Sequence, residues 1–300
     1  MQNLTTIGFI GAGNMAYAII SGLINNGFCA DNIKISDKNE SLLSLRKQEF
    51  NLEVFTDNIE LAAHCDVIIL AVKPQVLSSV CHQLKDSLKA NTLIISIAAG
   101  VRAHDIDRWL GGNAAIVRTM PNTPALLNQG VTGMFANECV SDTQKELAIS
   151  ILDSVGQSLW VSTEKMLDAV TALSGSGPAY FFLMIESMTN AGIALGLDEQ
   201  TAQTLSIQTA LGASMMADTS NHSPKELRAN VTSPNGTTQA AIESFQDQNF
   251  EMGSLAQEIV KHSGMECEIE LSDTNDHRSY FASFKKIKEA IGYSTEHTVK

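Results

Sequence analysis

The first half of this 300-residue chain alternates short apolar runs with longer segments of helical character. Short runs rich in Ile, Val and Leu and bounded by turn residues are typical of buried strands. Because parallel strands need long crossover segments between them, this alternation predicts an α/β fold with a doubly wound, mostly parallel sheet. The predicted strands are 6–10, 33–36, 67–72, 93–97 and 115–117, with edge strands at 131–135 and 158–161. The predicted helices between them are 14–25, 41–50, 58–64, 75–88 and 104–110.

The second half of the chain has helical patterns and no β-rich runs. A glycine-rich break at 174–177 precedes Pro178, which is expected to start the apolar helix 179–195. That segment carries a glutamate and an asparagine, which favours a buried core helix over a membrane span. Apolar residues recur near helical spacing over 198–217. Residues 223–226 (Ser-Pro-Lys-Glu) form a capping box with proline at the first helical position.

The change of pattern predicts two domains. We expect an N-terminal Rossmann-like, dinucleotide-binding domain at 1–163, on the evidence of the glycine motif described next, and an all-helical C-terminal domain at 164–300. The length of the chain suits two domains of ordinary size. The last residues, after about 275, are polar and weakly patterned, and we expect them to be weakly ordered.

Residues 11–16 read Gly-Ala-Gly-Asn-Met-Ala, directly after the first predicted strand and at the start of the first predicted helix. In this G-x-G-x-x-A pattern Gly11 permits a tight turn, Gly13 lets the backbone approach a pyrophosphate, and Ala16 allows close helix–strand packing. The helix N-terminus then offers N–H groups to the phosphates. The alternative is a glycine turn that binds nothing. The strand–turn–helix context favours a nicotinamide dinucleotide.

The residues after the other predicted strands extend the expected cofactor site. Asp37 would bind a free ribose 2′-hydroxyl and repel a 2′-phosphate, whereas Ser36 and Lys38 would bind the phosphate, so NADH and NADPH both remain open. Ligands of such sheets collect at the carboxyl ends of strands, where 71–74 and 98–100 lie. The residues predicted to line the cofactor are Gly11, Ala12, Gly13, Asn14, Met15, Ser36, Asp37, Lys38, Ala71, Val72, Lys73, Pro74, Ala98 and Ala99. A plain surface lysine is the alternative for Lys73.

A hydroxyl-rich loop in the helical half is a second candidate site. Residues 231–238 read Val-Thr-Ser-Pro-Asn-Gly-Thr-Thr and lead into a helix-compatible segment. Proline and glycine suit a tight turn, and the helix N-terminus that follows can hold an anion. The alternative is ordinary capping, because Ser, Thr, Asn and Gly also populate turns and N-caps. The loop is suited to grip a small carboxylate or phosphate.

Charge and cysteine usage exclude several classes of function. The formal charge of −13 and the sequence pI near 4.9 argue against nucleic acid or an anionic membrane as partner. Five scattered cysteines, without a Cys-x-x-Cys pair or zinc-type spacing, indicate reduced thiols in a cytoplasmic protein and no metal site. The N-terminal segment lacks the features of a signal peptide.

Several of these motifs occur together in one known family. The matching segments are 8–15 (Gly-Phe-Ile-Gly-Ala-Gly-Asn-Met), 71–75 (Ala-Val-Lys-Pro-Gln), 96–100 (Ser-Ile-Ala-Ala-Gly), 120–124 (Met-Pro-Asn-Thr-Pro), 168–180 and 231–238. In this order the chain resembles pyrroline-5-carboxylate reductase, the last enzyme of proline synthesis, over roughly residues 6–250. The resemblance implies an NAD(P)H-dependent oxidoreductase that reduces a cyclic imine. It also implies a homo-oligomer, in which two chains interlock through the helical domain and dimers often form rings.

The resemblance assigns roles to individual residues. The carboxylate of the imine would be bound by Ser233 and by backbone N–H groups from Gly236 to Thr238, including Thr237. The hydroxyl of Thr238 would contact the ring nitrogen, which makes Thr238 the candidate catalytic residue. Glu164 would lie near the substrate. The resemblance adds Asn58 to the cofactor residues and supports Val72, Lys73 and Ala99; it favours NADPH over NADH.

The chain also departs from the family pattern. Asn235 stands where members often have glycine, although asparagine tolerates positive φ better than most residues. Residues 261–271 lack the arginines usual there, which leaves C-terminal packing and assembly open. Two alternative functions remain: another imine or β-hydroxyacid reductase, and a non-catalytic nicotinamide-binding protein. The former typically relies on a lysine in the helical domain, and 164–224 contains only Lys165, ahead of the glycine-rich break.

Overall fold

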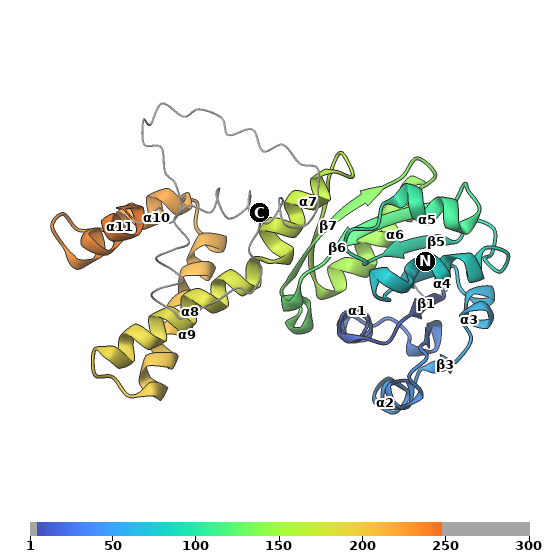
Figure 1. The fold of residues 1–300 in the computed structure, drawn as a ribbon, viewed down its shortest axis with the longest axis horizontal. Coiled ribbons are helices and arrows are strands. Elements are labelled where there is room, and N and C mark those ends of the chain that lie inside the picture. The colour runs from blue at the N-terminus through green and yellow to red at the C-terminus, as the bar shows by residue number, and fades with distance from the viewer. Residues whose placement is uncertain (1–4, 248–300) are drawn as a thin grey trace, which may run out of the picture. The chain divides into compact units, whose positions relative to one another are not determined.

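The computed structural model describes residues 5–247. The chain divides into two compact units, Met1–Pro178 and Ala179–Lys300. The first unit contains all the strands of the described region, and the second is helical as far as it is described (Figure 1). The expected order, an α/β sheet domain followed by an all-helical region, is therefore confirmed.

One eight-stranded sheet organises the first unit, in the order β3-β2-β1-β4-β5-β6-β7-β8. Its strands are β1 Ile7–Ile10, β2 Ile33–Ser36, β3 Glu53–Phe55, β4 Val67–Leu70, β5 Leu93–Ser96, β6 Ala115–Met120, β7 Gly130–Ala136 and β8 Gly156–Trp160. All neighbouring strands pair in parallel except β6 and β7. The strand order reverses at β1, which has β2 on one side and β4 on the other, and ligands of open α/β sheets bind at such a switch point.

Helices cover both faces of this sheet. They are α1 Asn14–Asn25, α2 Glu40–Phe50, α3 Asn58–His64, α4 Pro74–Leu84, α5 Ala103–Leu110, α6 Asp142–Leu152 and α7 Met166–Val170. Successive strand residues belong to two separate cores: Val67 and Ile69 pack with α1 and α6, whereas Ile68 and Leu70 pack with α3, α4 and α5. Continuous apolar strands are expected when helices cover both faces, because neither face meets water.

Two strands differ from the sequence prediction. The segment at 131–135 is predicted as an edge strand, but the strand found there, β7, lies inside the sheet, between β6 and β8, and only β8 forms that edge. A strand's position in the sheet depends on its partners, which its own residues do not record. The short strand β3 was not predicted, because three residues are too few to show a period.

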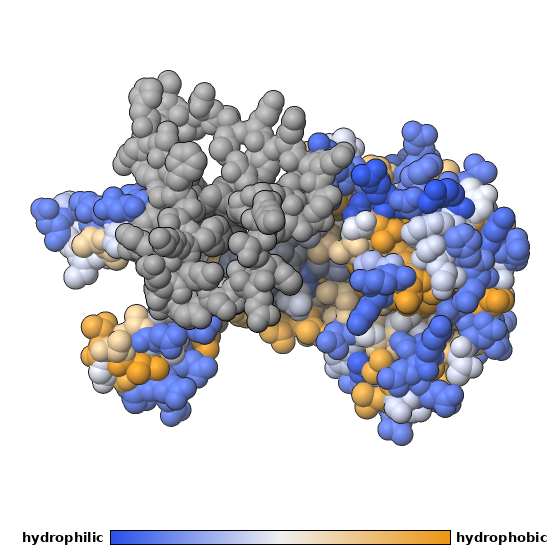
Figure 2. Space-filling view, viewed as in Figure 1, coloured by the Kyte–Doolittle hydropathy of each residue, from blue (hydrophilic) through white to orange (hydrophobic). Residues whose placement is uncertain are grey.

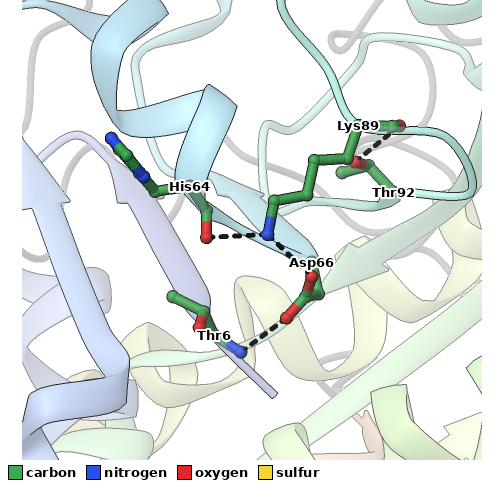
Figure 3. Close-up of polar contacts among 5 residues, drawn as sticks. All are labelled: Thr6, His64, Asp66, Lys89 and Thr92. Carbon is green, nitrogen blue, oxygen red and sulfur yellow. Dashed lines mark hydrogen bonds and ion pairs between the residues drawn. The ribbon is translucent and has the colours of Figure 1, made fainter. Parts of the chain in front are cut away.

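A polar network closes the edge of the sheet at the amino ends of β1, β4 and β5 (Figure 3). Lys89 donates to the carbonyl oxygen of His64 at 2.9 Å and to Asp66 at 3.0 Å, and Asp66 also accepts from the Thr6 N–H at 2.9 Å. Partial burial raises the pKa of Asp66, but the bonds from Thr6 and Lys89 outweigh it and hold the pKa below its usual range. The network therefore stabilises the fold at pH values above the ordinary aspartate pKa. This contribution is lost as the pH falls through the lowered pKa of Asp66.

The second unit is built on a helical hairpin. Its helices are α8 Gly177–Ala194, which starts at the end of the first unit, α9 Glu199–Thr219, α10 Pro224–Asn230 and α11 Thr237–Asp247. The hairpin packs closely where a Cβ at Gly192 would lie 3.0 Å from that of Ala202. The predicted capping box is confirmed, because the Ser223 hydroxyl accepts from the Glu226 N–H and the Glu226 carboxylate accepts from the Ser223 N–H.

The apolar face of the hairpin is exposed within one chain. Phe181 and Phe182 of α8 are 61% and 65% exposed, and Leu211 of α9 is 51% exposed. Figure 2 shows hydrophobic surface on this part of the molecule. The prediction of a buried core helix at 179–195 was therefore wrong for the single chain, because an apolar sequence does not reveal which surface will cover it. No helix in the described part of the chain combines the length and apolar character that a membrane crossing requires.

The packing of α1 gives a test of the fold. A Cβ at Gly22 would lie 2.4 Å from the carbonyl oxygen of Ser154. Alanine is usually favoured over glycine within a helix by about 1 kcal/mol. We nevertheless expect Gly22→Ala to lower the free energy of unfolding by about 1–3 kcal/mol, because the Ser154 backbone must move. Denaturant unfolding measures this, with Ser21→Ala on the same helix as a near-neutral control. A Gly22→Ala protein at least as stable as the parent would contradict this packing.

Candidate active site

The N-terminus of α1 has the geometry of a phosphate cradle. Gly11 has φ +106°, and a Cβ there would lie 2.5 Å from the carbonyl oxygen of Ala71, so the turn requires glycine. A Cβ at Gly13 would meet nothing within 4 Å, which leaves open space in front of the backbone. The first turn has no acidic residue and no side-chain cap. Its N–H groups can therefore bind an anionic group such as a pyrophosphate.

Asp37 holds this cradle in place. Its two carboxylate oxygens accept the backbone N–H groups of Ala12 at 2.8 Å and Asn39 at 2.9 Å. Ser36 is completely buried, and its hydroxyl donates to the Asn58 side-chain oxygen at 2.8 Å, so it faces the protein interior. Lys38 is exposed. Of the three side chains considered for the ribose end, Lys38 is the one at the surface, where it can meet a phosphate.

The remaining predicted cofactor segments follow the same edge of the sheet. Ile10 of β1 pairs with Ser36 of β2 and Leu70 of β4, and Leu70 pairs with Ser96 of β5. In each of these strands the paired residue is the last, so residues 11–15, 37–38, 71–74 and 97–100 start side by side. Among the predicted residues, Lys73 and Ala99 are exposed, Val72 and Pro74 are half-buried, and Ala98 is buried. The sheet thus brings these four segments to one edge.

Glu164 lies in a polar cluster on the sheet domain. Its Oε1 accepts the Ala103 N–H at the start of α5 at 2.6 Å and pairs with Arg118 of β6 at 3.1 Å. The Arg118 side chain is 8% exposed and that of Glu164 is 23% exposed. The carboxylate therefore caps α5 and neutralises a buried guanidinium. The structure gives Glu164 a structural role that the sequence did not suggest.

The hydroxyl-rich loop of the second unit forms a tight turn before α11. The Gly236 N–H bonds to the Ser233 carbonyl oxygen at 3.0 Å, and Asn235 has φ +59°, the left-handed conformation that asparagine tolerates. The Thr232 hydroxyl is engaged, because it donates to the Arg228 carbonyl oxygen at 2.6 Å. The first turn of α11 carries no acidic residue. Thr237 and Thr238 lie in that first turn. A helix N-terminus can bind an anion, and anion binding at this loop stays a prediction.

The described cysteines fall into a buried pair and an exposed pair. Burial raises the pKa of Cys65 and of Cys81 to about 12, so both thiols stay protonated near neutral pH. Cys29 and Cys139 are exposed, and Cys267 lies outside the described residues. Within 5–247, no group of three or more His, Cys, Asp or Glu side chains is arranged to hold a metal ion.

Comparison with known proteins finds family models that match parts of both units. The family model described as "Pyrroline-5-carboxylate reductase dimerisation" matches residues 164–263, and that of "NADP oxidoreductase coenzyme F420-dependent" matches 6–100. A pyrroline-5-carboxylate reductase of Pseudomonas aeruginosa is 51% identical over 245 residues, 82% of this chain and 90% of the relative. The chain belongs to the pyrroline-5-carboxylate reductase family.

Solved structures of family members share the fold. A pyrroline-5-carboxylate reductase from Coxiella burnetii has a TM-score of 0.83 at 42% identity, over 87% of this chain and 98% of that one. The pyrroline carboxylate reductase of Plasmodium falciparum, solved with NADP bound, has a TM-score of 0.79 at 31% identity, over 88% of this chain and 98% of that one. The resemblance inferred from the sequence motifs is confirmed.

Two features of the site went unrecognised in the sequence. The sequence predicts Asp37 only as a ribose ligand, whereas in the fold its carboxylate accepts the Ala12 and Asn39 N–H groups. Asn122 belongs to the motif at 120–124, which by itself assigns it no role, and its side chain bonds to Ser174 and Val131. Its position shortly after a predicted strand is the available sequence signal, since an amide that becomes buried there needs hydrogen-bond partners.

The Glu164 cluster predicts a stability effect. Replacing Glu164 with alanine leaves the Arg118 charge and the Ala103 N–H without this partner, so we expect a loss of about 1–3 kcal/mol in the free energy of unfolding. Glu164→Gln should cost less, because its side-chain oxygen can still accept the Ala103 N–H. Lys145→Ala, which removes an exposed ion pair with Asp142, should change stability by less than about 0.5 kcal/mol. Equal effects of Glu164→Ala and Lys145→Ala in denaturant unfolding would contradict this role.

Proposed function

We propose that this chain reduces 1-pyrroline-5-carboxylate to L-proline with a hydride from NAD(P)H, the final step of proline biosynthesis. The observation that carries the proposal is the Pseudomonas aeruginosa relative, because 245 aligned residues extend over both compact units. The phosphate cradle at 11–13 and the hydroxyl-rich loop at 231–238 supply the two binding chemistries that the reaction needs. Positioning and electrostatics dominate such a reaction, which requires no nucleophilic side chain.

Each binding element has a role in this reaction. The bound nicotinamide supplies the hydride that reduces the imine carbon. The N–H groups at the start of α1 hold the pyrophosphate, and the segments 71–74 and 97–100 line the path of the nicotinamide arm. Ser233 and the N–H groups of Thr237 and Thr238 hold the substrate carboxylate, whereas the Gly236 N–H, also expected from the sequence to bind it, closes the turn on the Ser233 carbonyl oxygen. The Thr238 hydroxyl orients the ring nitrogen and relays its proton.

NADPH is the proposed cofactor, with NADH as the alternative. The carboxylate of Asp37 already accepts two backbone N–H groups, whereas Lys38 is exposed and cationic. The Plasmodium falciparum relative was solved with NADP bound. A lysine at the ribose end favours a 2′-phosphate by charge-assisted hydrogen bonding.

Self-association follows from the dimerisation family model over 164–263. We propose that two chains bury the exposed apolar residues of α8 and α9 against each other and that the protein acts in the cytoplasm. The described part of the helical region supports the contact with large apolar side chains that one chain leaves exposed. Residues 261–271, whose missing arginines bear on larger rings, lie outside the described residues, as does the segment after 275.

A direct assay tests the proposed reaction. Purified protein is mixed with 1-pyrroline-5-carboxylate and either NADPH or NADH, and the nicotinamide absorbance is followed while proline is quantified. We expect cofactor consumption matched by proline formation, faster with NADPH. Folded protein that consumes neither cofactor would refute the proposal. Binding of NADPH without turnover would indicate a non-catalytic nicotinamide-binding protein, and turnover of another imine or a β-hydroxyacid alone would indicate a different reductase.

Lys38 gives a prediction on cofactor choice. We expect Lys38→Ala to raise KM for NADPH about tenfold, because a charge-assisted bond to the 2′-phosphate is worth roughly 1.5 kcal/mol. KM for NADH should change less than twofold. Lys47→Ala, at an exposed lysine of α2, is the matched charge control and should leave both values unchanged. Equal rises in KM for the two cofactors after Lys38→Ala would contradict this role.

Thr238 gives a prediction on the chemical step. Thr238→Ala removes one hydrogen bond to the imine, worth about 1–2 kcal/mol, so we expect kcat/KM for the imine to fall roughly tenfold. The control is Thr232→Ala in the same loop, because the Thr232 hydroxyl is already bonded to Arg228 and should contribute little to turnover. Steady-state kinetics with saturating NADPH measures both variants. Unchanged turnover and imine KM in Thr238→Ala would remove Thr238 from the mechanism.

A further inference from the structure

We propose that Asn122 is a positioning residue for the imine reduction proposed above, on which this inference rests. Asn122 follows β6 at the carboxyl edge of the sheet, and its side chain holds the glycine-rich segment 174–177 through the Ser174 carbonyl oxygen. The Asn122 side chain replaces a backbone N–H donor that Pro178 cannot supply. We infer that the segment 174–177, held in this way, contributes to the nicotinamide end of the site.

The hydrogen bonds of Asn122 orient its side chain fully. Its Nδ2 donates to the Ser174 carbonyl oxygen at 3.1 Å, and its Oδ1 accepts the Val131 N–H at 2.9 Å. The residue is 9% exposed, so both ends of the amide depend on protein partners. A buried amide bonded at both ends has one stable orientation, and it joins the start of β7 to the segment before α8.

The sequence explains why Ser174 needs an outside donor. In a regular α-helix the carbonyl of Ser174 would accept the N–H of residue 178, four positions later. Residue 178 is proline and has no N–H. The backbone at 171–175 forms a π-helical turn, in which the Ser176 N–H bonds to the Thr171 carbonyl oxygen at 2.8 Å. Such turns are frequent at functional sites. Asn122 therefore compensates for the missing donor at this turn.

The location of the clamp connects it with the reaction. β6 pairs in parallel with β5, and Arg118 lies opposite Ser96, so 121–124 leaves the sheet at the same edge as the cofactor segment 97–100. A Cβ at Gly175 would lie 2.6 Å from the Met120 side chain, so glycine allows the π-helical turn to close onto β6. A shift of the π-helical turn would move the residues that border the cofactor segment 97–100. Displacements of about 1 Å can lower a reaction rate a hundredfold.

The decisive experiment is a rescue of the Asn122→Ala variant by replacement of Pro178. We expect Asn122→Ala to lower kcat/KM for pyrroline-5-carboxylate roughly tenfold and to leave KM for NADPH within about twofold, because β1 and its cradle lie three strands away. Adding Pro178→Ala restores an N–H four residues after Ser174 and should recover several-fold of that loss. The matched control, Asn122→Ala with Pro124→Ala, changes a proline that is not placed to serve Ser174 and should recover nothing.

Two further measurements distinguish a positioning role of Asn122 from a purely structural one. Asn122→Asp keeps an acceptor for Val131 but loses the donor to Ser174, so it should reproduce the kinetic loss even if Asn122→Ala folds poorly. Unfolding of the same variants needs no substrate, and coupling between positions 122 and 178 should change the unfolding equilibrium constant about tenfold.

The outcomes separate the two proposals. A kinetic loss that Pro178→Ala does not relieve, or that Pro124→Ala relieves equally, would overturn the clamp. Lower stability with unchanged kinetics would also overturn it, because Asn122 would then be purely structural. A parent protein that folds but consumes no cofactor with this imine would refute the proposed function itself, whether or not positions 122 and 178 are coupled in unfolding.

Discussion

The parallel register around β1 is the constraint on which the candidate site depends. Ile10 pairs with the last residue of β2 on one side and with the last residue of β4 on the other. The loops after these three strands therefore begin side by side at the carboxyl edge of the sheet. Gly11 then turns within van der Waals reach of the Ala71 backbone, an approach that a Cβ would prevent. A slip of one residue in either pairing would move the side chains of that strand to the opposite face and separate the cradle from its neighbours.

Asp37 extends this constraint from the backbone to the electrostatics of the site. Its carboxylate holds Ala12 and Asn39, so a negative charge lies beside the cradle while its oxygens are occupied by N–H groups. The exposed cation at Lys38 then lies at the surface next to it. The two residues therefore differ in role: Asp37 bonds to the backbone of the site, whereas the Lys38 side chain lies at the surface.

Much of the local structure could be predicted from residues that act on near neighbours in the sequence. The fingerprint at 11–16, the capping box at 223–226 and the positive φ tolerated by Asn235 depend on neighbours within a few positions, and the structure has each of them. The confirmed family membership followed from motifs of the same kind. The interior position of β7 and the exposed face of α8 could not be predicted, because both depend on surfaces distant in the sequence or on another chain.

The sequence by itself determined the fold class, the glycine turn before α1 and the tight turn before α11, because each follows from backbone conformation and periodicity encoded in short segments. Only the tertiary structure decided what the polar side chains with partners remote in sequence do. In the fold the Ser36 hydroxyl bonds to Asn58, and the Glu164 carboxylate bonds to Arg118 and to the first N–H of α5. The Asn122 side chain bonds to the Ser174 carbonyl oxygen, for which Pro178 has no N–H to offer. The physical reason is that a side-chain hydrogen bond joins residues remote in sequence, and its partners are fixed only when the strands have assembled in register.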